Sequence, residues 1–149
     1  MRVVVAMSGG VDSSVAASLL AQAGHEVIGL SMQLYDQRQS PHAFGSCCSL
    51  DDLHDARRVA AAIGIPHYIV NFEERFQTSV VRNFVSEYAA GRTPIPCVHC
   101  NADLKFATLV ERAEALDAAA VGTGHYARVV FDEAAGRYRL LRSVDREKD

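Results

Sequence analysis

Short apolar, β-branched runs alternate along the chain with longer segments whose apolar residues recur at helical spacing. The short runs predict buried strands at residues 2–7, 26–34, 67–71 and 118–123. The longer segments predict helices at residues 13–23, 50–63, 73–90 and 101–116. Repeated strand–helix–strand units predict an α/β fold, with a doubly wound, mostly parallel sheet and helices on both faces.

The segments between these elements carry turn and loop signals. Residues 35–48 are irregular and polar, and Pro94 and Pro96 predict a loop over 91–100, with the next helix beginning at Asn101. Residues 127–131 and 138–142 predict a hairpin. Ligands of parallel sheets lie at the carboxyl ends of the strands. The candidate sites are therefore the loops after the first, second and fourth strands, with any loop folded over them.

Size and composition fit one ordinary globular domain. The chain has 149 residues, of which 49% are hydrophobic and 22% are charged, and a net charge of -3 neither indicates nor excludes a nucleic-acid partner. No apolar stretch approaches the roughly 18 residues of a membrane helix, and the N-terminal run is not a signal peptide. We therefore expect a cytoplasmic protein with no membrane partner.

A glycine-rich loop follows the first predicted strand and leads directly into a helix. Gly9 and Gly10 allow a sharp turn, and the free N–H groups at the start of the helix point toward an anion. Asp12 would repel a bare phosphate but suits a Mg²⁺ ion that bridges to phosphates. The loop lacks the lysine of a Walker loop and the spacing of a dinucleotide loop. The alternative is a simple Gly/Ser turn before a capped helix.

Four cysteines lie in two close pairs, Cys47/Cys48 and Cys97/Cys100. Without a secretory signal, such pairs indicate thiol chemistry or metal binding. We expect Cys100 beside a helix N-terminus, where the helix dipole favours a thiolate nucleophile. The alternatives are a zinc site or an iron–sulfur cluster at Cys97 and Cys100, completed by other cysteines, although adjacent cysteines are poor partners in a tetrahedral site.

The two loops together resemble the N-terminal catalytic domain of the bacterial tRNA-specific 2-thiouridylases, which are PP-loop ATP pyrophosphatases. The segments that carry the resemblance are AMSGGVDS at 6–13, CCS at 47–49 with DARRVA at 55–60, TPIPCVHCNADLK at 93–105 with Phe106, GTGHYAR at 122–128, and DREKD at 145–149. The resemblance implies an adenine-nucleotide α-hydrolase-like, Rossmann-like fold.

The resemblance also implies residue roles. The residues implied to bind ATP phosphates are Ala6, Met7, Ser8, Gly9, Gly10, Val11, Asp12 and Ser13. Met32 and Gly124 are implied to contact the adenosine, and Asp12 and Cys100 to be catalytic. The residues implied to approach the target base or the rest of the tRNA are Ile95, Pro96, Cys97, His125, Lys148 and Asp149. The structural alternatives are core packing for Met32 and a solvated loop position for His125.

The implied reaction uses ATP and Mg²⁺. The O2 atom of the wobble uridine attacks the α-phosphate and pyrophosphate leaves. A persulfide on a second cysteine then delivers sulfur to C2 and AMP leaves, while Cys100 attacks the persulfide or takes part in the remaining disulfide. The implied partners are tRNA and a sulfur-relay protein fed by a cysteine desulfurase.

Two features depart from the family pattern. Ile95 stands where we expect asparagine, and the chain, read as one domain over 1–149, lacks the central and C-terminal domains and the second cysteine. We therefore expect a fragment or a stand-alone remnant that binds ATP and thiolates tRNA incompletely. The alternatives are an amidating synthetase of the same superfamily, in which Cys100 has no purpose, and a non-catalytic nucleotide- or zinc-binding module.

Overall fold

A computed structural model of the chain describes residues 1–34, 49–145 and 147. Its central feature is a parallel sheet of four strands, β1 (Arg2–Ala6), β2 (Glu26–Gln33), β3 (His67–Asn71) and β4 (Ala120–Gly122). The strand order is β3-β2-β1-β4, and Val4 pairs with Ile28 on one side and Val121 on the other. The chain moves outward from β1 to β3 and then returns to the opposite side of β1. This reversal creates a crevice at the carboxyl ends of β1 and β4.

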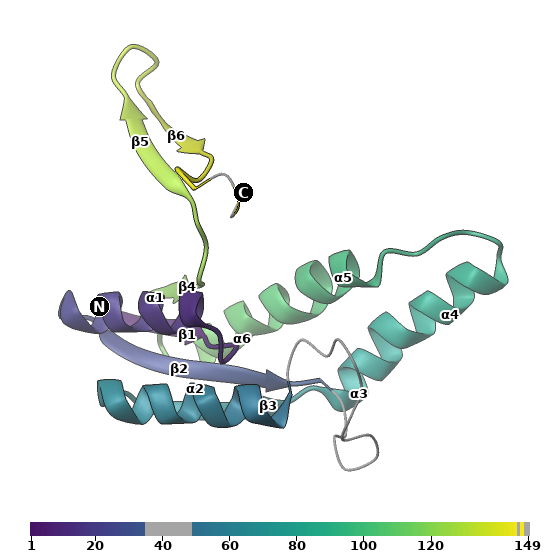
Figure 1. Cartoon of the computed structure of the whole chain (residues 1–149). Coiled ribbons are helices and arrows are strands. Elements are labelled where there is room, and N and C mark those ends of the chain that lie inside the picture. Colours follow the sequence, from purple (N-terminus) through teal and green to yellow (C-terminus); the bar gives the residue numbers. More distant parts are fainter. Residues whose placement is uncertain (35–48, 146, 148–149) are drawn as a thin grey trace.

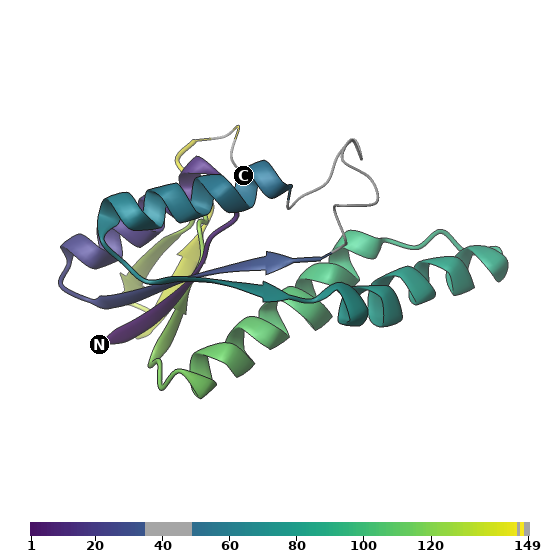
Figure 2. The ribbon, with the colours of Figure 1, turned by 90° about the horizontal axis from the view of Figure 1, so that it is seen from below.

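Helices cover both faces of the sheet, as predicted (Figure 2). Val3 and Val5 of β1 pack with residues of α1 (Val11–Gln22) and α2 (Leu50–Ile63), whereas Val4 packs with residues of α6 (Ala107–Ala115). Successive strand side chains point to opposite faces, which explains why every residue from Val3 to Val5 is buried. The β-branched residues of β1 thus belong to the hydrophobic cores on both faces of the sheet.

Two long antiparallel helices form an arm that projects beyond the sheet (Figure 1). The outgoing helix consists of α3 (Glu73–Phe76), the π-helical segment η1 (Gln77–Val81) and α4 (Arg82–Ala89). The returning helix consists of α5 (Pro96–His99), the π-helical segment η2 (Cys100–Phe106) and α6. The prediction for 73–90 was correct in extent, but two wide turns within the arm were not foreseen.

The returning helix begins earlier than the sequence pattern predicted. The predicted loop over 91–100 is present only over 91–95. Pro96 is the first residue of the helix, so the predicted start at Asn101 was wrong. Proline suits this position because its fixed φ is already helical and its missing N–H has no helical partner to lose. As a consequence, Cys97 and Cys100 lie within a helix.

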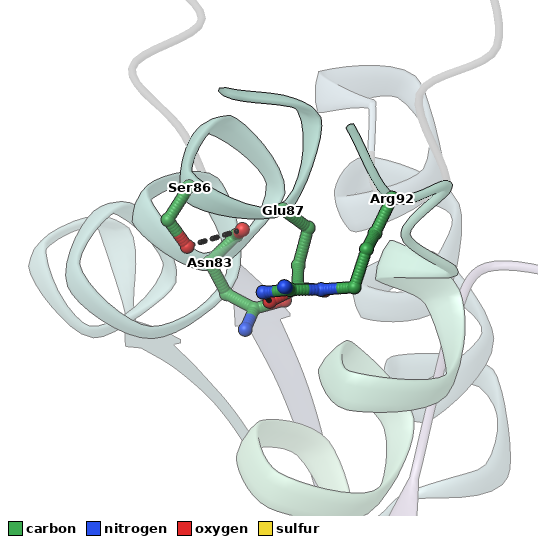
Figure 3. Close-up of polar contacts among 4 residues, drawn as sticks. All are labelled: Asn83, Ser86, Glu87 and Arg92. Atoms are coloured by element: carbon green, nitrogen blue, oxygen red, sulfur yellow. Dashed lines mark hydrogen bonds and ion pairs between the residues drawn. The ribbon is translucent and has the colours of Figure 1, made fainter. Parts of the chain in front are cut away.

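An ion pair closes the tip of the arm. Arg92 donates from Nε and Nη2 to the two carboxylate oxygens of Glu87, at 2.5 and 2.6 Å (Figure 3). Beside it, the Ser86 hydroxyl donates to the Asn83 carbonyl, 2.9 Å away. Arg92 lowers the pKa of Glu87 by hydrogen bonding, and Glu87 raises the pKa of Arg92. This two-point contact orients the chain just before it enters α5.

Local signals place the remaining elements. A capping box begins α2: the Ser49 hydroxyl accepts from the Asp52 N–H (3.1 Å), and the Ser49 N–H donates to Asp52 Oδ2 (2.8 Å). Strands β5 (Arg128–Asp132) and β6 (Arg137–Leu141) form the predicted hairpin as a separate sheet (Figure 1). β4 is shorter than the predicted 118–123. No helix in the described parts of the chain is long and apolar enough to cross a membrane.

Candidate functional site

The glycine-rich loop turns from β1 into α1 at the carboxyl edge of the sheet. The Met7 N–H donates to the Leu30 carbonyl (2.9 Å), which ties the start of the loop to β2. Gly9 then adopts φ +81°, a conformation that other residues rarely take. Gly10 is the N-cap of α1, so the helix starts at Val11 and includes Asp12, which was predicted to lie in the turn.

The loop serines hold the turn together. The buried Ser13 hydroxyl accepts from the Ser8 N–H (3.2 Å) and donates to the Gly10 carbonyl (3.1 Å). The Ser14 hydroxyl donates to the same carbonyl at 2.8 Å. Ser8 and Ser13 were expected to bind ATP phosphates. In the structure they first serve to fix the shape of the loop.

Two glycines allow a close approach of backbone segments that any side chain would prevent. One contact lies between the loop and α2, and the other between α1 and the segment after β4. A Cβ atom added to Gly9 would lie 2.3 Å from the carbonyl oxygen of Asp52, in the first turn of α2. One added to Gly124, just after β4, would lie 2.5 Å from the backbone nitrogen of Ser13. Both neighbours are backbone atoms and cannot swing away. The loop and the first turn of α1 are therefore held between α2 and the segment after β4.

The start of α1 has the features of an anion site. The first N–H groups of a helix lack intrahelical partners, and no side chain in the described part of the chain caps them. Asp12 lies in this first turn, and its Oδ1 accepts a hydrogen bond from the Tyr126 hydroxyl at 3.1 Å. This hydrogen bond, with the Asp12 charge, raises the pKa of Tyr126. Sequence reasoning missed Tyr126, although it lies in the GHYAR segment.

A cavity of about 220 Å³ opens beside the loop. It is lined by residues of the loop, of β2, of the Cys100-bearing helix and of the segment after β4: Ala6, Met7, Ser8, Leu30, Met32, Asn101, Lys105, Phe106, Leu109, Thr123 and His125. Of the predicted site residues, Ala6, Met7, Ser8, Met32 and His125 meet here. Asn101, Lys105 and Phe106 of the returning helix also line the cavity, and none of them was predicted as a site residue.

The cavity and loop suit a nucleotide. Much of the lining is apolar, including Met32 and Leu109, as the flat face of a purine requires. Phosphates can bind the first N–H groups of the adjacent helix α1, which no side chain among the described residues caps. Asp12 supplies a carboxylate for Mg²⁺, which usually takes one or two carboxylates together with substrate phosphates. The residues present therefore fit ATP with Mg²⁺.

The cysteines lie differently from the prediction. Cys97 is exposed in the first turn of the returning helix, whereas Cys100 is its fifth residue and is only 6% exposed. The helix-dipole argument for Cys100 was therefore wrong, because the dipole acts within the first turn. In the described residues no group of three or more His, Cys, Asp or Glu is placed to hold a metal ion. Cys47 and Cys48, which were considered as further ligands, lie outside them.

The predicted tRNA-contacting residues fall in two places. Ile95, Pro96 and Cys97 lie together at the start of the returning helix, where Ile95 is 64% exposed. His125 lines the cavity, and its Nδ1 lies 3.4 Å from the Thr123 hydroxyl. Lys148 and Asp149 lie outside the described residues.

A buried polar chain supports the loop from beneath. The Ser31 hydroxyl, 1% exposed, donates to the Met7 carbonyl (2.6 Å) and lies 2.9 Å from His67 Nε2. Because the Ser31 hydroxyl donates its one proton to the Met7 carbonyl, it can only accept a hydrogen bond from His67. The Nε2 atom of His67 therefore carries the imidazole proton and donates it to Ser31. His67 Nδ1 is buried without a partner among the described residues, and burial lowers the pKa of this imidazole. Neutral His67 thus holds Ser31, which in turn holds the Met7 carbonyl at the start of the loop.

The chain closely resembles proteins of one family along its length. Residues 1–149 match the family model described as "tRNA methyl transferase HUP domain". A protein of Solibacter usitatus named tRNA-specific 2-thiouridylase is 56% identical over 99% of this chain, and one of Geotalea uraniireducens with the same name is 58% identical over 99%. The chain spans 41% and 40% of the lengths of these relatives.

A solved structure supports the fold. The NMN synthetase from Francisella tularensis matches 83% of this chain and 45% of its own, with a TM-score of 0.52 and 21% identity. At this identity the match bears on the fold alone, and it agrees with the predicted adenine-nucleotide α-hydrolase-like architecture. From its sheet, its nucleotide-binding loop and its match over residues 1–149, the chain belongs to the tRNA methyl transferase HUP domain family.

Proposed function

We propose that residues 1–149 form the PP-loop ATP-pyrophosphatase domain of a tRNA 2-thiouridylase. This domain adenylates the C2 oxygen of a wobble uridine in tRNA, so that sulfur can replace that oxygen. The names of the relatives that are more than 50% identical support this assignment. The central and C-terminal domains of such an enzyme lie outside this sequence.

One structural observation carries the proposal. The cavity beside the glycine-rich loop is also lined by Asn101, Lys105 and Phe106, which follow Cys100 on the same helix. A nucleotide in this cavity therefore contacts the element that carries the candidate nucleophile. An amidating synthetase has no use for a cysteine there, so this arrangement favours sulfur transfer.

The residues of the loop would bind and orient the substrate. Bound ATP with Mg²⁺ supplies the adenylyl group and neutralises phosphate charge. The N–H groups at the start of α1 hold phosphate oxygens, and Asp12 holds the metal ion. Met32 lines the apolar part of the cavity, and Gly124 acts on the nucleotide through its contact with Ser13. Because the loop is held between two backbone contacts, these donors are oriented before the substrate arrives.

The sulfur chemistry involves the arm. Cys100 is the proposed nucleophile toward the persulfide of a second cysteine outside this sequence, and a sulfur-relay protein fed by a cysteine desulfurase supplies the sulfur. Since Cys100 is buried, the arm must shift before the thiol can react. Ile95, Pro96 and Cys97, at the start of the returning helix, are the proposed contacts to the target base. His125, Lys148 and Asp149 are the proposed contacts to the rest of the tRNA, and the cytoplasm is the proposed location.

Isothermal titration with ATP and Mg²⁺, together with a pyrophosphate-release assay with and without tRNA, tests the proposal. Asp12→Asn should weaken Mg²⁺-dependent ATP binding at least about tenfold, because hydrogen bonds and ligands to charged groups contribute about 1.5–3 kcal/mol. Asp55→Asn, on the exposed face of α2, is the matched control and should bind as the wild type does.

The tRNA dependence separates the candidate functions. Release of pyrophosphate that requires a tRNA with uridine at the wobble position, and not cytidine, is expected of a 2-thiouridylase. Release that ignores tRNA but responds to a small acid and ammonia would replace the proposal with the amidating synthetase. ATP binding without any release, together with one bound zinc per chain, would replace it with the non-catalytic module.

A further inference from the structure

Lys105 occupies a distinctive place in the cavity. The π-helical segment η2 turns Cys100 and Leu104 into the core, at 6% and 2% exposure, while Asn101, Lys105 and Phe106 line the cavity. Among the cavity-lining residues that the structure describes, Lys105 is the one Lys or Arg. Lys105 lines the cavity, and a lysine ammonium is a compact charge with three donors that suits a phosphate oxygen.

The position of this charge selects one phosphate. The cavity is about 220 Å³, smaller than the roughly 300–1,000 Å³ of most ligand pockets, so it suits a nucleoside and not a whole triphosphate. The terminal phosphates then extend over the loop to the N–H groups at the start of α1. The phosphate still in reach of the cavity lining is the one attached to the nucleoside. Ser8, where the loop leaves β1, and Lys105, on the returning helix, both line this cavity.

We propose that Lys105 binds the α-phosphate of the nucleotide. The inference rests on the proposed function and adds a catalytic residue to it. Lys105 supplies positive charge at the phosphorus that the uridine oxygen attacks, where negative charge grows as the new P–O bond forms and pyrophosphate leaves. Since Lys105 follows Cys100 by little more than one helical turn, a single helix carries both the group for adenylation and the group for sulfur transfer.

The test is isothermal titration of the whole chain with three probes: adenosine, AMP and inorganic pyrophosphate with Mg²⁺. Lys105→Gln should weaken AMP binding about tenfold to a hundredfold, as expected for the loss of a charge-assisted hydrogen bond. The affinities for adenosine and for pyrophosphate should not change. Lys105→Arg, which keeps the charge, should recover most of the AMP affinity. Arg112→Gln, on α6 outside the cavity, should leave all three affinities as in the wild type.

The probes distinguish the ways in which the inference can fail. Equal AMP affinity in Lys105→Gln and the wild type would overturn it and leave the proposed function intact. Equal losses for adenosine and AMP would also overturn it, since Lys105 would then support the cavity and not a phosphate. If the wild type binds none of the three probes, the nucleotide site itself, and with it the proposed function, is wrong. Thermal melting of each variant shows that the comparison is made between folded proteins.

Discussion

Replacement of Gly124 by alanine is the most direct test of how the loop is held. The added Cβ would lie 2.5 Å from the Ser13 nitrogen, 2.6 Å from the Asp12 carbonyl carbon and 2.9 Å from its oxygen. Ordinary contact begins near 3.4 Å, so the segment after β4 and the start of α1 must separate by roughly 0.9 Å. All three atoms belong to the backbone of one helical turn, so no side-chain rotation can relieve the overlap.

Both stability and binding should respond. Overpacking of this kind costs about 1–3 kcal/mol, which for a chain of this size corresponds to a Tm lower by roughly 3–9 °C. The N–H groups at the start of α1 move with the helix, so ATP affinity should fall about tenfold or more. Thermal melting and titration with ATP and Mg²⁺ measure the two effects separately.

Gly122→Ala is the matched control, since it adds the same methyl group two residues earlier. Its Cβ would meet only the ends of the Leu20 and Val5 side chains, both at 3.1 Å, which can shift by a few tenths of an ångström. It should lower the Tm only slightly and leave ATP affinity unchanged. If Gly124→Ala melts and binds like the wild type, the loop is not held by this contact and the reasoning is refuted.

Three other predictions concern groups around the site. Tyr126→Phe removes the hydrogen bond to Asp12 and should raise the Mg²⁺ concentration needed for ATP binding. Tyrosinate absorbance should lose a component that titrates at a more alkaline pH than an ordinary tyrosine, and an unchanged Mg²⁺ requirement would contradict this. Burial lowers the pKa of His67 below its usual 6.5, so the unfolded state takes up a proton before the folded state does as the pH falls. The contribution of His67 to the free energy of unfolding is therefore fully present above pH 6.5 and declines below it. In urea unfolding at several pH values this decline should be shallower for His67→Gln, and an equal slope would refute the assignment. Alkylation followed by mass spectrometry should modify exposed Cys97 faster than buried Cys100 in the resting chain, and the reverse order would show that the arm is already open.

Most of the fold was predictable because local and periodic signals agree. The strand at the N-terminus and the hairpin were both confirmed. The start of the returning helix was mispredicted because proline, read as a helix breaker, is also a favoured first residue of a helix. Whether Pro96 ends a helix or begins one depends on its environment in the folded chain. The site was predictable as far as the loop after β1, whose glycines and serines mark a turn into a helix.

The amino-acid sequence by itself determined the fold class, the position of the nucleotide loop and the residue types available for chemistry, since these depend on periodicity and on backbone preferences of neighbouring residues. The tertiary structure alone decided which distant residues meet. It placed Gly124 against Ser13, Tyr126 on Asp12, and Lys105 in the cavity beside the loop, and it buried Cys100. Contacts between residues far apart in the chain depend on strand order and helix packing, which no local pattern specifies.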